Sequence, residues 1–551
     1  MEQLLQKREN NTEQPGGLFS GKVFFVLSVL LGGLLALFFT PMLIFCFTDA
    51  GELLPLVLFF LPAAAFFLWC FSKGIDSISL SRRGKIILGV CVGLFLMAAQ
   101  LRLAKAIYGK IDYDFNSVYF AGQSMAQTGS LGENPEYFAQ FPNNLLLVFV
   151  FAFLFKAAWF LGISNLMAVL TGCSLLLVDL SIVLACLCAK KVMGNKAALM
   201  VFVLSLPLAV LHYGIVCPYS DTFGMVFPML LLFLYLYLPK KTSSACAITA
   251  LMGILAAVGY KIKPQTVIVV IAIALTELFY HKIDKKRLLH MAQRAGCFLL
   301  ALVLCTAGMN FCARKLTAGS ITDEMRESMQ TPPTHYLMMG LNLDTGGFWS
   351  GEDYAATGSL KTQKEKVAYN LKVSGERLQA MGIVGYGRFL LQKGRRIFHS
   401  AYMDMWVRSP YLNTDPLSVA LQDTFSQSSA AQADNFGSGF RVYLQFLQAL
   451  WIILLALWVL PLFFCRDSYR DKFAAILRLT IMGLTAFQLL FEGGARYRFH
   501  QTPVFILLAV YGMCHLPQGL RETKISLQKR FGKKADRKAA EAEPLEIAEE
   551  K

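Results

Sequence analysis

The chain has 551 residues, of which 56% are hydrophobic and 16% are charged, whereas an ordinary soluble domain has about 25% charged residues. This composition excludes a soluble globular protein, and repeated apolar runs of about twenty residues indicate a polytopic membrane protein. The net charge of +16 does not indicate a nucleic-acid partner, because the basic residues lie mostly in short loops and tails. Anionic lipid headgroups and the orientation of the spans explain basic residues at such places.

The thirteen cysteines fall in or beside apolar segments, and none lies between residues 316 and 440. We therefore expect neither a disulfide framework nor a structural zinc site. The N-terminus is too long and too acidic for a signal peptide, so the first apolar run is expected to be retained as a helix.

Apolar segments long enough to enter a membrane recur along the chain, and they predict an all-α polytopic membrane protein with about 12–13 transmembrane helices. The expected spans are roughly 23–48, 52–72, 86–107, 143–161, 165–189, 197–213, 220–239, 244–260, 264–281, 295–313, 442–465, 473–491 and 501–517. Basic residues near both termini place both ends in the cytoplasm, which requires an even number of crossings. One segment must then be half-spanning, re-entrant or interfacial. Counts from the two ends conflict between 143 and 189, where Lys156 and Asp179 are expected to form a satisfied pair rather than a proton relay.

This topology divides the chain into five regions. They are a cytoplasmic N-terminus (1–22), a membrane domain (23–315), a long extracytoplasmic loop (316–440), C-terminal transmembrane helices (441–517) and a cytoplasmic charged tail (518–551). Within the membrane domain, the external loop 108–142 is amphipathic and is expected to form interfacial helices. The tail changes from basic to acidic and is expected to be loosely structured.

The long loop is expected to be mostly helical, with residues 376–406 as its clearest helix. Its aromatic residues and Lys393, Arg395 and Arg396 fit a helix that lies on a headgroup layer. Residues 415–439, rich in Ser, Gln, Asp and Ala, are expected to be flexible.

Asp112 and Asp114 begin the external loop directly after a predicted span. A carboxylate at a membrane boundary needs a partner, so we consider a general base, or a base together with a metal ligand. The alternative is a solvated pair that ends the preceding helix. No cofactor is required, although Asp112 and Asp114 could hold a divalent cation, Mg²⁺ or Mn²⁺.

Two further candidate pairs lie at predicted outer helix ends. In Tyr219-Ser220-Asp221, either Ser220 or Asp221 caps a helix, or Asp221 supplies a second acid to the cavity that Asp114 faces, with Tyr219 beside it as a candidate for substrate binding. Lys261 and Lys263, in GYKIKPQ, are either lysines that snorkel to the interface or point charges for a lipid phosphate.

Near the C-terminus, Arg496, Tyr497 and Arg498 lie in the segment EGGARYR after a predicted span. Two arginines at an external helix end fit a phosphate or pyrophosphate clamp, with Glu492 available to neutralise one of them. In the long loop, His335 lies in the densest polar and aromatic cluster. It either contacts an acceptor or packs in the core of the loop.

The order of these motifs resembles the GT-C superfamily of integral membrane glycosyltransferases, which use polyprenyl-phosphate sugars. The resemblance is strongest to the branch with protein O-mannosyltransferases and aminoarabinose transferases, in its bacterial cell-envelope form, and covers most of 86–315 and the last two spans. It implies that Asp114 or Asp112 is the catalytic base. It also implies that the family's phosphate-binding basic residues correspond to Lys261, Lys263, Arg496 and Arg498. This chain departs from the family in having three spans before the acidic loop, where the family typically has one.

The resulting hypothesis is a hexosyl or pentosyl glycosyltransferase of the plasma membrane, the bacterial cytoplasmic membrane, with an extracytoplasmic active site. It would move a sugar from a polyprenyl-phosphate donor to a cell-wall polysaccharide or other envelope glycopolymer, a lipid or a protein, by an inverting single displacement. Alternatives are a transporter or flippase of lipid-linked sugars, and a polysaccharide polymerase or ligase. Polar residues gather at one membrane face rather than at mid-depth, which favours an interfacial enzyme over a transporter.

Overall fold

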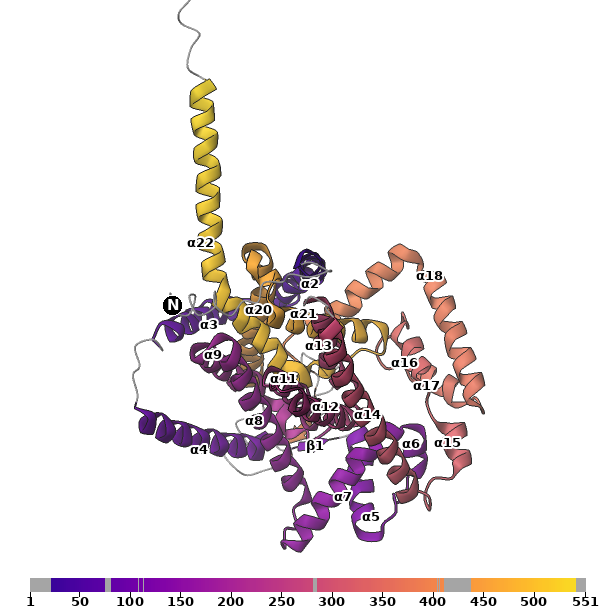
Figure 1. Ribbon diagram of the computed structural model, residues 1–551. Helices are drawn as coiled ribbons and strands as arrows, with labels where there is room; N and C mark the ends of the chain where they lie inside the picture. Colours follow the sequence, from indigo (N-terminus) through magenta and orange to yellow (C-terminus); the bar gives the residue numbers. More distant parts are fainter. Residues whose placement is uncertain are drawn as a thin grey trace, which may run out of the picture.

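The computed structural model describes residues 21–541 apart from 75–80, 108, 112, 281–284, 404, 406 and 411–437. Helices build nearly all of this part of the chain (Figure 1), which confirms the predicted fold class. A short antiparallel ribbon joins strands β1 (Gly109–Ile111) and β2 (Val407–Pro410), with Ile111 opposite Val407. The ribbon therefore links the loop after the third span to the end of the long loop.

Ten helices of the described residues are long and apolar enough to cross a membrane. Each coincides or overlaps with one of the following helices: α2 (Gly21–Thr48), α3 (Leu54–Gly74), α4 (Arg82–Ile107), α7 (Leu145–Phe160), α8 (Leu166–Met193), α12 (Thr242–Ile262), α14 (Lys285–Leu316), α20 (Ser438–Phe464), α21 (Lys472–Leu490) and α22 (Thr502–Glu541). Three shorter apolar helices complete the expected set. They comprise α9 (Asn195–Ser205) with a π-helical turn (Leu206–Val210), α10 (Ser220–Phe223) with α11 (Val226–Leu236), and α13 (Val267–Tyr280).

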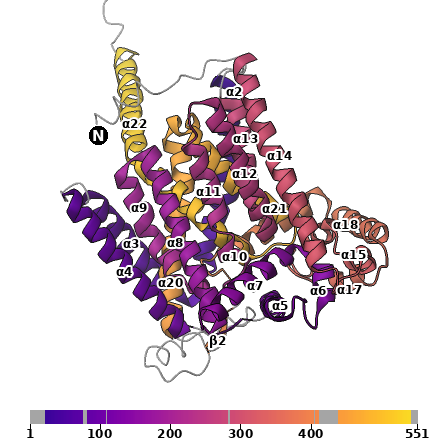
Figure 2. The same ribbon diagram turned by 60° about the horizontal axis from the view of Figure 1, so that its bottom comes forward.

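The residue before α7 and the first half of α8 contact the same part of the bundle. Asn144, directly before α7, accepts a hydrogen bond from the hydroxyl of Tyr219 at 3.1 Å. In the first half of α8, Ser174 donates to the carbonyl of Ile215 at 3.2 Å, a few residues before Tyr219. Figure 2 shows α7 running obliquely across this end of the bundle. A path of α7 that does not cross the membrane would leave an even number of crossings and would account for the conflict that the sequence gives between 143 and 189.

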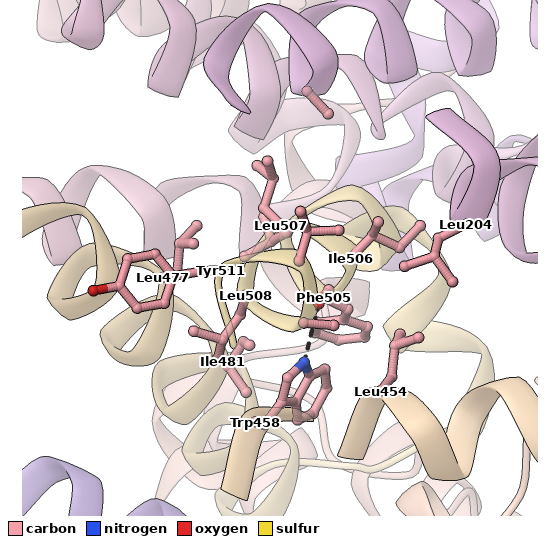
Figure 3. Close-up of a cluster of buried hydrophobic side chains, with 14 of the residues drawn as sticks. Leu204, Leu454, Trp458, Leu477, Ile481, Phe505, Ile506, Leu507, Leu508 and Tyr511 are labelled. Carbon is pink, nitrogen blue, oxygen red and sulfur yellow. Dashed lines mark hydrogen bonds between the residues drawn. The ribbon is translucent and has the colours of Figure 1, made fainter. Parts of the chain in front are cut away.

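The most buried part of the bundle lies where α20, α21 and α22 pack together (Figure 3). The indole Nε1 of Trp458 on α20 donates to the carbonyl of Phe505 on α22 at 3.0 Å. A buried indole N–H requires such a partner, so this bond fixes how the two helices meet. By contrast, α4 and α14 lie at the periphery and expose apolar side chains, as a lipid-facing surface requires.

The long loop is mostly helical, as predicted. Its helices are α15 (Asp323–Met329), α16 (Pro333–Gly340), α17 (Gly351–Gly358) and α18 (Gln363–Phe398). A capping box of Thr362 and Glu365 begins α18. The helix bends at Gly382, where φ is +59°, a conformation that favours glycine. Nearly all of the segment 415–439, predicted to be flexible, lies outside the described residues.

Three cations of α18 have a different role from the predicted contact with headgroups. Lys393 is buried, and its Nζ donates to the carbonyls of Gly340, Leu489 and Phe491 at 2.7, 3.1 and 2.6 Å. Arg395 forms a two-point ion pair with Asp49, which directly follows α2, at 2.8 and 2.5 Å. Arg396 donates to the carbonyl of Thr345 at 2.5 Å. These side chains bind protein groups because α18 lies across the ends of other helices.

Two other predictions are wrong. Asp179 accepts a hydrogen bond from Gln100 of α4 at 2.8 Å, whereas Lys156 is exposed, so these two residues form no pair. The tail was expected to be loosely structured from 518, but α22 continues through Glu541. Residues 518–541 are rich in Lys, Arg, Ala, Glu and Gln, which are good helix formers and extend the last span.

Candidate active site

Polar side chains from distant parts of the chain meet where several helices begin or end. Helix ends leave backbone groups without intrahelical partners, so polar residues are common there. The site is built by the starts of α5 (Asp114–Thr128), α7 and α10, by α6 (Pro135–Gln140), by the end of α12, and by the segment between α21 and α22. We call the following set the polar cluster: Asp114, Tyr137, Asn144, Tyr219, Asp221, Lys263, Glu492, Arg496 and Tyr497.

Asp221 is fully buried between two cations. Its Oδ1 accepts a hydrogen bond from Nζ of Lys263, and its Oδ2 lies 3.2 Å from Nη1 of Arg496. All three side chains are buried. Buried charges are stable only when they are paired, and here one carboxylate serves two cations. Two cations thus share one fully buried carboxylate, and the carboxyl groups of Asp114 and Glu492 also lie within the electrostatic influence of Arg496.

Asp114 is the first residue of α5, and the residue before it, Tyr113, has a φ of +62°. Burial raises the pKa of the Asp114 carboxyl, while a hydrogen bond from Tyr137 and the positive charge of Arg496 act in the opposite direction. A carboxyl group with a raised pKa beside a buried cation is suited to take up a proton during a reaction.

A chain of hydrogen bonds leads to Asp114. The hydroxyl of Tyr219 donates to Oδ1 of Asn144 at 3.1 Å, and Nδ2 of Asn144 donates to the hydroxyl of Tyr137 at 2.7 Å. Burial raises the pKa of Tyr137, so its hydroxyl stays protonated and donates to the Asp114 carboxylate. Every donor in the chain therefore points toward Asp114 and holds its carboxylate in one orientation.

Aromatic rings frame the two cations. Nζ of Lys263 lies 5.0 Å from the centroid of the Tyr497 ring, and the guanidinium of Arg496 lies 5.6 and 5.3 Å from the rings of Tyr219 and Tyr497. Such contacts stabilise cations away from water. The hydroxyl of Tyr497 donates to Glu492 at 3.2 Å. Burial raises the pKa of the Glu492 carboxyl, and the hydrogen bond from Tyr497 and the charge of Arg496 lower it.

The structure brings together six of the residues that the sequence singled out: Asp114, Tyr219, Asp221, Lys263, Arg496 and Tyr497. Lys261 lies on the last turn of α12, is only partly buried and forms no ion pair with a described carboxylate. Asp112 lies outside the described residues, so its role as base or metal ligand stays a prediction.

Arg498 lies apart from the polar cluster. It is fully buried, its Nη2 donates to the carbonyls of Ser400 and Tyr402 at 2.8 and 3.3 Å, and its guanidinium lies 4.8 Å from the Trp451 ring. The predicted clamp of two arginines is therefore not formed. Arg496 and Arg498 are two residues apart on a 3₁₀ turn, so their side chains point to different sides.

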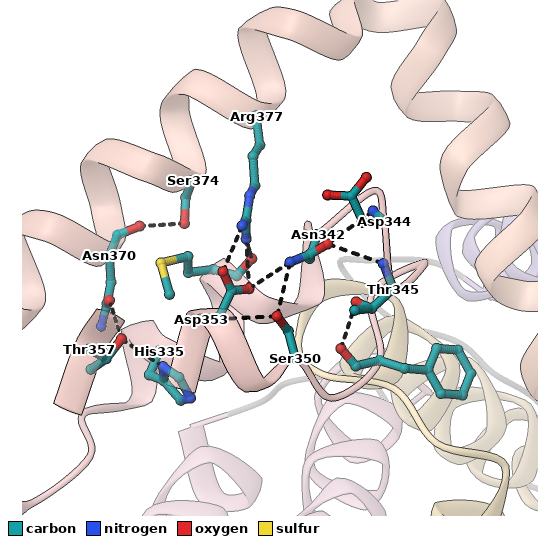
Figure 4. A network of polar contacts seen from close by, with 12 residues as sticks. His335, Asn342, Asp344, Thr345, Ser350, Asp353, Thr357, Asn370, Ser374 and Arg377 are labelled. Atoms are coloured by element: carbon teal, nitrogen blue, oxygen red, sulfur yellow. Dashed lines mark hydrogen bonds and ion pairs between the residues drawn. The ribbon is translucent and has the colours of Figure 1, made fainter. Parts of the chain in front are cut away.

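His335 belongs to a separate network in the long loop (Figure 4). Its Nδ1 lies 2.8 Å from the hydroxyl of Thr357, which in turn donates to Asn370 at 2.9 Å. Nearby, Asp353 receives two hydrogen bonds from Arg377 at 2.7 and 2.9 Å. Burial lowers the pKa of His335 to about 4, so the ring is neutral near pH 7. These contacts support the packed loop core rather than a contact with acceptor.

Backbone hydrogen bonds nevertheless connect the long loop to the polar cluster. The amide of Glu492 donates to the carbonyl of Tyr336, and the amide of Gly493 donates to that of Gly347, both at 2.9 Å. The segment that carries Glu492 and Arg496 is thus held by α16 and the loop after it.

Tyr137 and Asn144 are the functional candidates that the sequence left out. Asn144 lies at the start of an expected span, and Tyr137 is one of several aromatic residues in the amphipathic loop 108–142. Their hydrogen bonds to each other and to Tyr219 come from different helices, which local sequence patterns do not indicate.

Within the described ranges, no group of three or more His, Cys, Asp or Glu side chains is arranged to hold a metal ion. A cation site that uses both Asp112 and Asp114 is not tested by this, because Asp112 is not among those residues.

Comparisons with known proteins give two matches to solved structures and one match to a family model. The crystal structure of ArnT from Cupriavidus metallidurans bound to undecaprenyl phosphate matches 80% of this chain and 79% of that chain, with 13% identity and a TM-score of 0.31. The same protein in the apo state matches 79% of this chain and 76% of that chain, with 12% identity and a TM-score of 0.30. No curated protein matches the chain. Residues 56–515 match the model of a family described as conserved hypothetical integral membrane protein, and the chain belongs to that family.

Proposed function

We propose that the protein is a membrane glycosyltransferase that moves a sugar from a polyprenyl-phosphate donor to an acceptor hydroxyl. The observation that carries the proposal is the position of Asp114, a partly buried carboxylate with a raised pKa, beside the buried set of Lys263, Asp221 and Arg496. One candidate base and two buried cations thus occur in the same cluster.

The chemistry assigns a role to each group. Asp114 takes the proton of the acceptor hydroxyl as its oxygen attacks the anomeric carbon, and the bond from that carbon to the phosphate oxygen breaks. Lys263 and Arg496 stabilise the negative charge that develops on the departing lipid phosphate, a contribution of about 3 kcal/mol for a well-placed donor. Attack from the face opposite the phosphate inverts the anomeric centre. One base is sufficient because phosphate leaves without being protonated, unlike the leaving group of a glycosidase.

The remaining residues of the polar cluster position these groups. Tyr137 and Asn144 orient the Asp114 carboxylate toward one direction of proton transfer. Asp221 holds Lys263 and Arg496 close together, although the two cations would otherwise repel each other. This preorganisation reduces the rearrangement needed when charge develops on the phosphate.

The place of the polar cluster in the fold supports a lipid-borne donor. Its residues lie at the ends of long apolar helices, where the phosphate of a lipid would meet the membrane boundary while its chain stays in the bilayer. The proposal puts this boundary on the extracytoplasmic face of a bacterial plasma membrane, with 316–440 on the same face and 1–22 and 518–551 in the cytoplasm. The acceptor would be an envelope glycopolymer, lipid or protein.

The test is incubation of the purified protein in lipid nanodiscs with a panel of radiolabelled undecaprenyl-phosphate sugars and envelope extracts. We expect one donor to be consumed, with release of undecaprenyl phosphate and transfer of label to acceptor. Asp114→Asn should abolish transfer at an unchanged yield of folded protein, whereas Asp344→Asn, at an exposed carboxylate of the long loop, should not. Normal transfer by the Asp114 variant would exclude it as the base. Movement of intact donor across the membrane without its cleavage would instead support a flippase.

A further inference from the structure

The bend of α18 exposes apolar side chains at its apex. Ile383 directly follows Gly382 and is 94% exposed, and the next residue, Val384, is 69% exposed. Leu378 before the bend and Leu391 after it are also exposed. Neighbouring β-branched apolar residues with this exposure are unfavourable in water, because nothing in the described protein covers them.

The second limb of α18, from Ile383 to Phe398, is fixed at the end of the membrane bundle. Lys393 donates to the last carbonyls of α21 and its extension, Leu489 and Phe491. Arg395 pairs with Asp49 at the end of α2. Both contacts place this limb at the level where predicted membrane spans terminate.

Close packing against α2 fixes the depth further. A Cβ on Gly394 would lie 2.6 Å from Cζ of Phe38, so the limb touches α2 well before that helix ends at Thr48. Phe398 packs edge-on against Phe38 and Phe39, with ring centroids 5.8 and 5.2 Å apart. The limb therefore contacts an apolar part of a predicted span rather than a region beyond the membrane.

From this contact the limb leads away from the bundle. Ile383 lies eleven residues before Gly394, which is about 16 Å of helix. Figure 1 shows α18 projecting as a bent arm with its apex away from the other helices, and Figure 2 shows α18 beside the bundle, nearer to its middle than α15 and α17. The apex thus extends sideways near the predicted membrane boundary.

The charge of this part of α18 favours a lipid surface. Residues 377–398 contain no Asp or Glu. Of their five cations, Arg377, Lys393, Arg395 and Arg396 bind protein groups, which leaves Arg388 as the cation available to a lipid surface. Arg388, six residues after the bend, is exposed. A segment with exposed apolar residues and no carboxylate is suited to the boundary between acyl chains and anionic headgroups.

We propose that the bend of α18 inserts Ile383 and Val384 into the interfacial layer of the bilayer beside α2. The membrane, rather than a second protein, covers these side chains. This contact holds α18, and through it the long loop, against the flank of the bundle. The proposal does not depend on glycosyl transfer, since it rests on the position and exposure of α18 alone.

Site-specific photocrosslinking in cell membranes tests the proposal. The photoreactive amino acid p-benzoylphenylalanine replaces Ile383, Leu300 on the lipid-exposed α14, or Lys372 on the first limb of α18, in cells grown with an alkyne fatty acid. Irradiation and attachment of a fluorescent azide then report lipid bound covalently to the full-length protein. We expect a lipid adduct from position 383 as strong as that from 300, and none from 372. A protein adduct from 383, or no lipid adduct from 383 when 300 gives one, would overturn the proposal.

A second measurement uses the trypsin site at Arg388 in proteoliposomes that contain anionic phosphatidylglycerol. In the parent protein the bilayer should protect the bond after Arg388. The double variant Ile383→Asp, Val384→Asp should lose this protection, because carboxylates do not enter the acyl boundary. Lys372→Asp should retain it. Both substituted positions are exposed, so the fold is preserved, and equal cleavage of the double variant and its parent would contradict the insertion.

Discussion

Asp221 and Arg496 form an ion pair of 3.2 Å inside the protein, and both side chains are buried. Lys263 binds the other oxygen of the same carboxylate. The ion pair therefore joins the start of α10 to the segment before α22, and the bond from Lys263 joins the end of α12 to both.

Asp221→Asn should strongly destabilise the protein. The substitution leaves Lys263 and Arg496 buried without their shared carboxylate, and loss of one partner of a buried ion pair costs about 3–5 kcal/mol. Thermal or denaturant unfolding in detergent measures the effect. Asp323→Asn is the matched control, because its pair with Arg314 is exposed, and it should leave the midpoint unchanged. An unchanged midpoint for Asp221→Asn would show that the buried pair is not needed for stability.

Substitution of the cations should show that transfer depends on Lys263 and Arg496 and does not depend on Lys261. Arg496→Lys loses the planar guanidinium, and Lys263→Met loses a charge, so each should lower kcat/KM for the lipid-phosphate donor about 100-fold. Steady-state kinetics over donor concentration provide the measurement. Lys261→Met should have little effect, because Lys261 forms no ion pair with the described carboxylates of the polar cluster. A large loss for Lys261→Met with none for Arg496→Lys would favour a different phosphate site.

The pH dependence of transfer should report on Asp114. The base must be ionised, so activity is expected to fall as pH decreases through a pKa that burial raises above the usual value of about 3.9. Tyr137→Phe removes the hydrogen bond that lowers this pKa, so the acid limb of the kcat/KM profile should move to higher pH. Tyr354→Phe, which removes a contact with Gln140 instead, should leave the profile in place. A shift to lower pH for Tyr137→Phe would contradict the assigned hydrogen bond.

The long loop should become less stable in mild acid. His335 has a folded pKa lowered to about 4 by burial, against about 6.5 when exposed. Its contribution to stability is therefore complete above the unfolded pKa and is lost as pH falls toward the folded pKa. The opening of residues 333–377 that hydrogen exchange measures should therefore increase as the pH falls from about 6.5 towards about 4. His335→Gln should reduce the dependence on pH and leave the KM for the acceptor unchanged, whereas a raised KM for the acceptor would support the predicted contact of His335 with the acceptor.

Hydropathy predicted the helical architecture well, because spans must be long, apolar and internally hydrogen-bonded. The path of α7 could not be obtained in this way, since its length and composition are those of a span. Only the contacts of Asn144 and Ser174 with residues around Tyr219 indicate that the segments before and after α7 lie near the same end of the bundle. The β1–β2 ribbon was also not predicted, because it joins short segments that are remote in the chain.

The sequence predicted members of the polar cluster where a charged residue lies at the end of an apolar run, because a charge at such a place needs a partner or a function. This applied to Asp114, Asp221, Lys263 and Arg496. It could not separate Arg496 from Arg498, because the direction of each side chain depends on a turn that forms only with tertiary contacts. Tyr137 gave no signal of its own, since an aromatic residue in an amphipathic loop is ordinary.

The path of α7 changes which side of the membrane is assigned to each loop of this protein. If α7 does not cross the membrane, the turn at Gly162, between α7 and α8, lies on the side that contains Asp114, although simple alternation of apolar segments would give it the opposite side. A reporter placed in that turn would therefore share its aqueous phase with one in the long loop. Topology maps drawn from hydropathy alone would invert every assignment between that turn and the end of the chain.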